Sequence, residues 1–454
     1  MDLESSRGVF SNQEQYGHYE EEVGRCCQIL QTQHADTSER KQTITHLSQL
    51  ILDHQEELLP QEKEKTLECL SHITRSDQVP SCRELILSLL GNERWTHWKA
   101  QNCAGVIHSL STIPENHLPQ GISRSVICPA FNHFAFLLIS DSSSRAEDCI
   151  SVLRDLGQLA EDGRLRDLSE ENQNLIQDNV CALLFRLKSL DLDSDECSDA
   201  LLSLGRLAGN SCLKGILEEG LCFFQKHVIS LLSLLEHQHP DAQDCARALV
   251  SLGTLAHLGY LEQQEKNSSL QKTICSLICH FRAEGPYTKK CSDVLVELGH
   301  LVQRGHLKNL PNKDRISLSK SICDLTSSGG DEGPNTEQCS EIFWSLGQIA
   351  QCGLLQEIDE TAQESLQKGI SNLLSSIRNK NPSAGECSQA LTGLSQLVDD
   401  GCLNSCLNGL SEEEECSFRG SVDDLISIFL DTTPGGGCIP LSLQKWSHSL
   451  LLNA

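Results

Sequence analysis

The chain has little positive charge and few aromatic residues for its length. Its 454 residues include 36 lysines and arginines against 63 aspartates and glutamates, which gives a formal net charge of −27, and aromatic residues make up 4%. A negative field of this size argues against nonspecific binding to nucleic acid or to an anionic membrane, although it leaves room for a local basic strip. The apolar residues are mainly leucine, isoleucine, valine and alanine, which suits stacked helices.

The sequence also lacks segments that would target or anchor it. Residues 1–22 contain neither a basic stretch nor an apolar run, so they do not resemble a classical signal peptide. No window approaches the roughly 18 uninterrupted apolar residues of a transmembrane helix. We therefore expect a soluble protein without membrane insertion, in which residues 1–22 form a flexible acidic tail.

Common catalytic motifs are missing as well. The sequence contains no GxxxxGK[ST] phosphate loop, no GxGxxG before a helix, no HExxH and no GxSxG, and no strand-like run that could support a nucleotide fold. We therefore expect no enzyme activity, no catalytic residues and no cofactor. The catalytic alternative is a cysteine-dependent enzyme, which needs a thiol on an exposed helix face; Cys352 is the residue to test.

Cysteine is plentiful, but its pattern does not predict disulfides. The number, 23, is odd, and many of the residues fall on apolar helix faces, where a free cysteine acts as a small hydrophobic residue. The sequence therefore predicts a reducing compartment.

Two cysteine clusters are candidates for a zinc site. They are Cys275, Cys279 and His280, and Cys402, Cys406 and Cys416. Neither contains the paired CxxC motifs of structural zinc sites, and a cysteine pair four residues apart on a helix is more often a core contact. We therefore predict no metal.

Internal repetition is the strongest signal in the sequence. Equivalent cysteines lie 46 or 48 residues apart, at Cys103, Cys149, Cys197, Cys245, Cys291, Cys339 and Cys387. Positions within a repeat are counted here as offsets from this cysteine. A small residue stands at offset 8, a glycine at offset 14 in most copies and a leucine at offset 16. A lattice of this kind is typical of repeat architectures.

Each repeat predicts two helices. In the copy that begins at Cys197, apolar residues recur at offsets 0, 3, 4, 7, 10 and 11, which is the period of an amphipathic helix. The glycine at offset 14 predicts a left-handed C-cap. A second amphipathic segment, such as residues 222–237 or 365–378, lies between successive copies. The unit is therefore helix, loop, helix, and about seven units predict an all-α solenoid.

The expected domain organisation follows from these repeats. Residues 23–102 are predicted to form an N-terminal helical cap with a divergent repeat, residues 103–437 the solenoid, and residues 438–454 a short C-terminal helix. Terminal repeats of a solenoid need such caps because their outer faces meet solvent.

The small residue at offset 8 interrupts a helix that would favour alanine. Glycine costs a helix interior about 1 kcal/mol relative to alanine. Since it recurs at five of the seven copies, we expect packing to offset that cost. The prediction is that glycine or serine here lets the backbones of neighbouring helices approach closely.

These repeats resemble octotricopeptide-type repeats. The segments CSDALLSLGRLAG, CARALVSLGTLAHLG and CSEIFWSLGQIAQCG are similar to the second helix of that family, and Trp344 stands where its mid-helix tryptophan does. The resemblance covers about residues 103–437. It implies an α-solenoid and an association with RNA. Longer relatives resemble repeats in secreted effectors of bacteria that live inside host cells.

A secretion signal is a further expectation from resemblance. Residues 411–418, SEEEECSF, are similar to the glutamate-rich cluster near the C-terminus of type IV secretion effectors. Together with the repeat resemblance, this implies a bacterial protein that remains in the cytoplasm or is delivered into the cytosol or nucleus of a host cell.

The candidate binding residues lie opposite the apolar stripe. Offset 9 is occupied by Gln158, Arg206, Thr254, His300, Gln348 and Gln396, a column without a carboxylate. Offset 5 adds Arg154 and Trp344 within a more apolar column. Stacked repeats would join these columns into one binding face, unless offset 5 packs against the next repeat and leaves offset 9 merely solvated.

Two partners fit such a face. A host protein fits the apolar column and needs no basic field. Single-stranded RNA, read one base per repeat, fits the hydrogen-bonding column. Phosphates would call for lysines and arginines beside the column, whereas its flanks carry Asp155, Glu161 and Asp162. We therefore prefer a protein partner and keep RNA as the alternative; the sequence does not predict an oligomeric state.

Overall fold

The described part of the chain is all helical. This computed structural model describes residues 21–30, 42–43, 45–47, 49–50, 53, 58–76, 89–90, 98–114, 118, 122–140, 146–216, 218–261, 268–285, 288–308, 310–329, 334–356, 358–407, 412–432 and 439–443. No β-strand occurs within these ranges. The predicted all-α solenoid class is confirmed.

The helices follow the sequence repeat in pairs. The helices that begin at or near the repeated cysteine are α5 (Ala100–Thr112), α7 (Ala146–Glu161), α9 (Ser194–Gly209), α11 (Ala242–His257), α13 (Thr288–Gln303), α15 (Thr336–Gln351) and α17 (Ala384–Asp399). The helices between them are α6 (Cys128–Ser140), α8 (Glu170–Leu187), α10 (Glu218–His237), α12 (Ser268–Ala283), α14 (Asn312–Gly329) and α16 (Glu360–Arg378). Outside the repeats lie α3 (Pro60–Ser76), α18 (Cys402–Leu407) and α19 (Glu412–Thr432), and the π-helical turn η3 (Ser123–Ile127) precedes α6.

The chain divides into two compact units. Unit 1 comprises Met1–Leu192 and Arg206–His227, and unit 2 comprises Asp193–Gly205 and Val228–Ala454. In unit 1, α3, α5 and α7 pack side by side in one layer, and α6 and α8 form the second layer against them.

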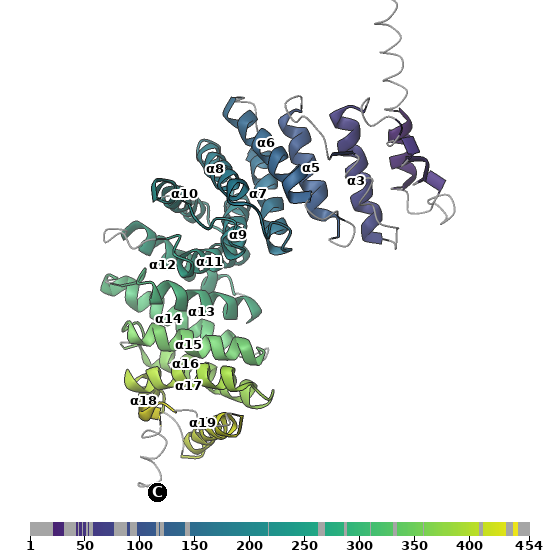
Figure 1. Cartoon of the computed structure of the whole chain (residues 1–454). Helices are drawn as coiled ribbons and strands as arrows, with labels where there is room; N and C mark the ends of the chain where they lie inside the picture. Colours follow the sequence, from purple (N-terminus) through teal and green to yellow (C-terminus); the bar gives the residue numbers. More distant parts are fainter. Residues whose placement is uncertain are drawn as a thin grey trace, which may run out of the picture. The chain divides into compact units, whose positions relative to one another are not determined.

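Unit 2 repeats the same two-layer arrangement. Helices α11, α13, α15 and α17 follow one another in one layer, and α12, α14 and α16 follow one another in the other (Figure 1). Helix α19 packs against both α16 and α17. Each repeat therefore contacts its neighbours in the sequence, which is the packing of a solenoid.

The helix ends form as the glycine pattern predicts. All five glycines at offset 14 have positive φ angles between 74° and 84°. After α11, the Gly259 N–H donates to the Ala256 carbonyl and the Tyr260 N–H to the Leu255 carbonyl. This hydrogen-bond pair is the Schellman motif, which satisfies the last carbonyls of the helix. The leucine at offset 16 then folds back into the core; Leu261 is 5% exposed.

Close backbone approach at offset 8 is confirmed, and the structure identifies its partner. A Cβ atom added to Gly299 would lie 2.8 Å from the Ser345 Cα, and one added to Gly347 would lie 2.9 Å from the Gly393 Cα. The facing residue is at offset 6 of the next repeat in each pair: Ser111–Asp155, Gly205–Ser251, Gly253–Glu297, Gly299–Ser345 and Gly347–Gly393. The sequence analysis had identified offset 8 but had missed offset 6, which is serine or glycine in most copies and Asp155 or Glu297 in the others.

The repeated cysteines belong to the core, as predicted. All seven are completely buried. Burial raises the pKa of the Cys197, Cys245 and Cys291 thiols to about 12. A protonated thiol in an apolar interior is a packing group and a poor nucleophile.

The expected ends of the chain are only partly described. The predicted acidic tail, apart from residues 21 and 22, and residues 444–454 lie outside the described residues. The domain bounds predicted from the sequence therefore stay a prediction. Among the described residues, no helix is long and apolar enough to cross a bilayer.

Candidate interaction face

The predicted binding residues lie on the helices that carry the repeated cysteine. All six offset-9 residues are half-buried, from Gln158 on α7 to Gln396 on α17. At offset 5, Arg154 is exposed and Trp344 is half-buried. We call the surface formed by offsets 2, 5, 9 and 12 of these helices the repeat face and describe it separately in each unit.

In unit 1 the repeat face is polar. The Arg206 guanidinium donates from Nη1 to the Gln158 Oε1 at 3.4 Å, and its Nε lies 3.0 Å from the Glu161 Oε2. Gln158 also donates to the Asp162 carboxylate at 2.9 Å. The structure therefore brings Gln158 and Arg206 together across adjacent repeats, and their hydrogen bonds hold both side chains in place. The only cation in these contacts is already paired with a carboxylate.

In unit 2 the repeat face contains a row of aromatic rings. The ring centroids of His257 and His300 are 4.3 Å apart, and those of His300 and Trp344 are 5.4 Å apart. These rings come from α11, α13 and α15 in order, so each stacks on the next repeat. Ring pairs at these distances prefer tilted or offset arrangements, and both pairs are tilted.

The Glu297 carboxylate connects the ring row to Thr254. The His300 Nδ1 lies 3.0 Å from the Glu297 Oε2, and the Thr254 hydroxyl lies 3.4 Å from the Glu297 Oε1. Glu297 occupies offset 6, where most other copies have serine or glycine, and Gly253 leaves space for it. One carboxylate thus links two offset-9 residues from neighbouring repeats.

Farther along unit 2 the face becomes polar again. The Gln348 amide donates from Nε2 to the Gln396 Oε1 at 3.2 Å, which joins α15 to α17. Offset 9 is therefore not merely solvated, because its side chains pair from repeat to repeat. At offset 5, Val250 and Val296 are half-buried and border the ring row.

Sequence reasoning named residues at offsets 5 and 9 as binding candidates and did not single out His257, at offset 12 of the same face. Glu297, at offset 6, counted there only as a flanking carboxylate. Each meets an offset-9 residue because adjacent helices are shifted by about one turn relative to each other. A search for aromatic or acidic residues three positions either side of offset 9 would have found both.

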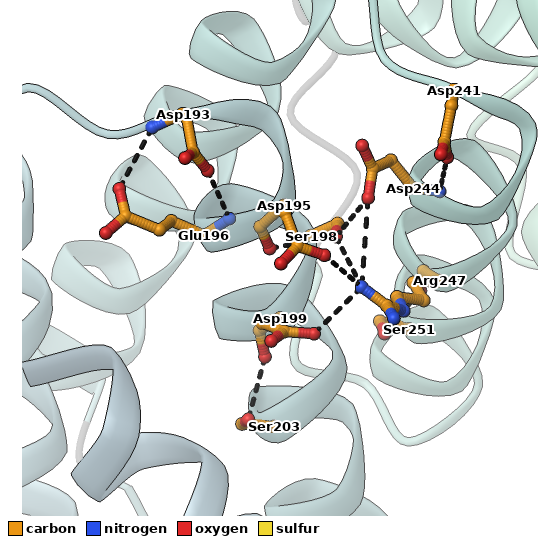
Figure 2. Close-up of polar contacts among 10 residues, drawn as sticks. All are labelled: Asp193, Asp195, Glu196, Ser198, Asp199, Ser203, Asp241, Asp244, Arg247 and Ser251. Carbon is orange, nitrogen blue, oxygen red and sulfur yellow. Dashed lines mark hydrogen bonds and ion pairs between the residues drawn. The ribbon is translucent and has the colours of Figure 1, made fainter. Parts of the chain in front are cut away.

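A cluster of carboxylates surrounds Arg247 at the start of unit 2. The Arg247 Nη1 lies 2.6 Å from the Asp195 Oδ1, 3.0 Å from the Asp199 Oδ1 and 3.8 Å from the Asp244 Oδ1 (Figure 2). The Ser198 hydroxyl donates to Asp244 at 2.8 Å. One guanidinium on α11 therefore binds carboxylates from both α9 and its own helix.

The titratable groups of the face are shifted mainly by burial. Burial lowers the pKa of His257, and the neighbouring charges of His300 and Arg304 lower it further. Burial raises the pKa of Glu341, and the carboxylates of Glu337, Glu297 and Asp293 add to the rise while His300 opposes it.

Three of the cysteines considered for chemistry lie in covered or hydrogen-bonded positions. Cys352 is half-buried, and burial raises the pKa of its thiol. Cys275 is buried, whereas the Cys279 Sγ lies 3.2 Å from the Ser317 hydroxyl. Within the described ranges, no group of three or more histidine, cysteine, aspartate or glutamate side chains is arranged to hold a metal ion.

The glutamate-rich segment 411–418 overlaps the start of α19. Helix α19 begins at Glu412, within this segment. Glu415 also pairs with Arg419 one turn later. Whether the segment serves in secretion stays a prediction.

Comparisons with known proteins identify no family. No family model matches the sequence, and no curated protein matches it either. Among solved structures, one that it resembles is described as a "circular tandem repeat protein with novel repeat topology and enhanced subunit contact surfaces". The identity is 12% over 93% of this chain and 98% of that chain, with a TM-score of 0.28. The helical-repeat architecture follows from the packing of this chain's own helices.

Proposed function

We propose that this chain is a non-catalytic binding scaffold that takes a protein partner on its repeat face. The observation that carries the proposal is the row formed by His257, His300 and Trp344, three half-exposed or exposed rings in series across three helices. Aromatic side chains that are partly accessible and held by their neighbours are typical anchors of protein interfaces.

Charge supports a protein over a nucleic acid. The Glu297 carboxylate contacts His300 in the ring row, and the whole chain carries a net charge of −27. RNA binding depends on neutralising phosphates with lysines and arginines. Arg206 and Arg247 are both paired with carboxylates of this chain.

RNA binding is the alternative that the ring row itself favours. Bases stack on histidine and tryptophan rings, and the paired Gln348 and Gln396 amides could hydrogen bond to base edges. The resemblance to octotricopeptide-type repeats supports the same alternative.

Binding to a random single-stranded RNA pool at low and moderate salt separates the two functions. For a protein-binding scaffold, we expect no RNA binding at moderate salt. Tight binding that weakens steeply with salt and is lost when Arg206, His300 and Gln348 are replaced would contradict the proposal and establish the alternative.

Site-directed photocrosslinking tests the protein partner. A photoreactive amino acid at Gln348 should crosslink a defined partner protein in a cell extract, and the additional change Trp344→Ala should remove that product. The same photoreactive group at Glu364, exposed on α16, is the matched control and should give no such product. Equal crosslinking from both positions would contradict the proposal.

Delivery into a host cell is a finer part of the proposal. Its support is the resemblance of the repeats to bacterial effector repeats and the glutamate-rich segment 411–418. A fusion to a translocation reporter should enter host cells through a type IV secretion system. Replacing the four glutamates with glutamine should stop entry while leaving expression unchanged; entry at the original level would remove this part of the proposal.

A further inference from the structure

The second-layer helices of unit 1 expose phenylalanine rings. Phe185 on α8 is 64% exposed, and Phe136 on α6, which packs beside α8, is 62% exposed. The Phe185 ring stacks on the Phe223 ring of α10 with centroids 6.2 Å apart, and its centroid lies 6.2 Å from that of His227. The rings of Phe223 and His227 are 4.0 Å apart. We call Phe185, Phe223 and His227, which all belong to unit 1, the aromatic patch.

The packing of the repeat does not require aromatic residues at these positions. Two repeats later, on α12 and α14, the same three positions hold Cys279, Ser317 and Ser321. These small side chains make the corresponding contacts, since the Cys279 Sγ lies 3.2 Å from the Ser317 hydroxyl and 3.8 Å from the Ser321 hydroxyl. Small polar groups therefore suffice to join neighbouring second-layer helices at this point.

The later repeats all have small residues in the columns of the two phenylalanines. Phe185 is matched by Ser233, Cys279, Ser327 and Ser375, and Phe223 is matched by Ser269, Ser317 and Ser365. Aromatic side chains are enriched at the centre of protein interfaces, where they act as anchors. An exposed phenylalanine in a column that otherwise holds serine or cysteine is therefore a candidate anchor for a partner.

Each of these phenylalanines is followed by a lysine on the same helix face. Lys188 comes three residues after Phe185, and Lys226 comes three residues after Phe223, which is about one helical turn. Both lysines are exposed. Within the described ranges, neither side chain makes an ion pair or a hydrogen bond. The aromatic patch is therefore bordered by two available cations, in a chain whose net charge is −27.

The position of Lys188 binds a carboxylate elsewhere in the chain. Arg282 occupies this position two repeats later, on α12, and its Nε lies 2.5 Å from the Asp324 Oδ2 of α14. In α10 the position of Asp324 is taken by Ser230. The Lys188 ammonium is therefore available for a carboxylate from another molecule.

We propose that the aromatic patch of unit 1 binds a protein segment that carries an aspartate or glutamate next to an apolar side chain. The apolar side chain packs on the Phe185 and Phe223 rings, and the carboxylate pairs with Lys188 or Lys226. The patch lies on second-layer helices, whereas the repeat face lies on the helices of the repeated cysteine. The inference thus adds a second binding surface to the proposed function and does not depend on it.

Charge favours this occupant over the others. RNA bases would stack on the rings, but two lysines neutralise few phosphates. The exposed carboxylates of Asp178 on α8 and Glu219 on α10 lie on the N-terminal side of the rings, so they repel a strand and direct the acidic end of a peptide towards the lysines. A second copy of the chain in a two-fold contact would bring the same lysines to both sides of the interface.

The test selects peptides with the full chain. A random peptide library displayed on phage is depleted on the double variant Phe185→Ser and Phe223→Ser and then panned on the unchanged protein. Because later repeats have serine in both columns, the double variant should keep its helix content and melting temperature in circular dichroism. We expect the enriched peptides to contain aspartate or glutamate beside leucine, isoleucine or an aromatic residue. Enrichment of basic peptides, or no enrichment, would overturn the inference.

Single variants then locate the site through the anisotropy of an enriched peptide labelled with fluorescein. Phe185→Ser should weaken binding about tenfold or more, since it removes buried apolar area. The matched control is Ile316→Ser, at a side chain 47% exposed on α14, and it should leave binding unchanged. An equal loss in both variants would mean nonspecific apolar binding, and the aromatic patch would not be the site.

Charge variants test the lysine in the same assay. Lys188→Glu should weaken peptide binding about tenfold, because attraction is replaced by repulsion, and Lys188→Arg should retain it. Lys214→Glu, at another exposed lysine of unit 1, is the control and should leave binding unchanged. Equal effects of Lys188→Glu and Lys214→Glu would mean long-range electrostatics and would remove Lys188 from the site.

The outcome is separable from that of the proposed function. Trp344→Ala, which should release a partner from the repeat face, should leave binding of the enriched peptide unchanged. Binding that is lost in Trp344→Ala and kept in Phe185→Ser would overturn the inference and leave the proposed function standing. Binding of random single-stranded RNA, or a dimer in sedimentation, that disappears in the double variant would assign the patch to RNA or to a second copy instead.

Discussion

At Ser211 the backbone has a φ angle of 64°, the left-handed conformation that five other repeats assign to glycine at the same offset. A side chain with a Cβ atom is disfavoured there by steric contact with its own backbone. The hydrogen bonds are nevertheless those of the glycine copies, since the Ser211 N–H donates to the Ala208 carbonyl and the Cys212 N–H to the Leu207 carbonyl. The rest of the repeat therefore imposes the conformation on serine.

Ser211→Gly is expected to stabilise the protein by about 1 kcal/mol, because it relieves this contact. The change is measured as the free energy of unfolding in urea. The reverse change at the same offset, Gly259→Ser, is the control. No atom lies within 4 Å of a Cβ at Gly259, whose φ angle is 84°, so its expected destabilisation of similar size isolates backbone strain. A loss of stability in Ser211→Gly would contradict this account.

Thiol reactivity should differ sharply between the repeated cysteines and exposed ones. Burial raises the pKa of Cys245 to about 12, so its thiolate fraction is about a thousandfold lower than that of a thiol with the ordinary pKa of 9.0. Mass spectrometry after brief iodoacetamide treatment should find Cys416, which is exposed, alkylated and Cys245 unmodified. In urea both should react. Fast alkylation of Cys245 in the folded protein would contradict its role as core filler.

His306 predicts a loss of stability in mild acid. It is 5% exposed, and burial lowers the pKa of its ring below the ordinary value. The unfolded state therefore binds the proton more readily. The histidine's contribution is fully present above a pH of about 6.5 and is lost as the pH falls through its folded pKa.

The measurement is the urea midpoint between about pH 5 and pH 7.5. We expect the midpoint to fall on the acid side, and His306→Leu to reduce this fall. His237→Gln, at an exposed histidine of α10, should leave the pH dependence unchanged. An unaltered pH dependence in His306→Leu would mean that other groups cause the loss.

At the scale of the helices, close packing depends on glycines that face the backbone of a neighbouring helix. Gly393 lies opposite the turn of α15 that contains Phe343 and Trp344, and an added Cβ would approach the Trp344 backbone nitrogen to 2.7 Å. Gly369 on α16 makes an equally close approach to Ser327 on α14. Both layers of unit 2 thus rely on helix backbones that nearly touch, which the intrinsic helix propensity of glycine opposes.

Gly393→Ala should destabilise the protein by roughly 2 kcal/mol or more, since the methyl group forces α15 and α17 apart. The matched control is Gly420→Ala in α19, where no atom lies within 4 Å of the added Cβ. That change should stabilise by up to about 1 kcal/mol through helix propensity alone. Thermal unfolding followed by circular dichroism measures both. The same sign for the two variants would contradict close approach as the reason for Gly393.

The contacts within the candidate face also depend on how neighbouring helices are placed. His300 contacts His257 on one side and Trp344 on the other, because each helix is shifted along its neighbour. The column at offset 9 was visible in the sequence. The ring row was not, since it crosses from offset 12 to offset 9 to offset 5.

At the scale of the whole molecule, the main electrostatic feature is the excess of acidic residues. The chain has 36 basic residues for 63 acidic ones, so even complete pairing would leave the whole net charge of −27 uncompensated. Like charges then repel across each unit and weaken the folded state, and salt screens this repulsion.

The melting temperature is therefore expected to rise when sodium chloride is increased from about 20 mM to about 500 mM. Ion pairs such as Arg247–Asp195 weaken in salt and act against the trend, but they involve far fewer charges. Potassium chloride at equal concentration should give the same rise, since screening depends on ionic strength. A fall in the melting temperature would mean that the ion pairs outweigh the repulsion.

The sequence alone determined the helices, their ends and the buried cysteines of this protein. Those features depend on spacing within one helix and its cap, where a period of about 3.6 residues and a left-handed glycine are local properties. Only the tertiary structure decided which side chains meet between repeats: offset 8 with offset 6, His300 with Trp344, and Arg247 with Asp199. These contacts depend on the shift and rotation of one helix against the next, and no spacing within a single repeat contains that information.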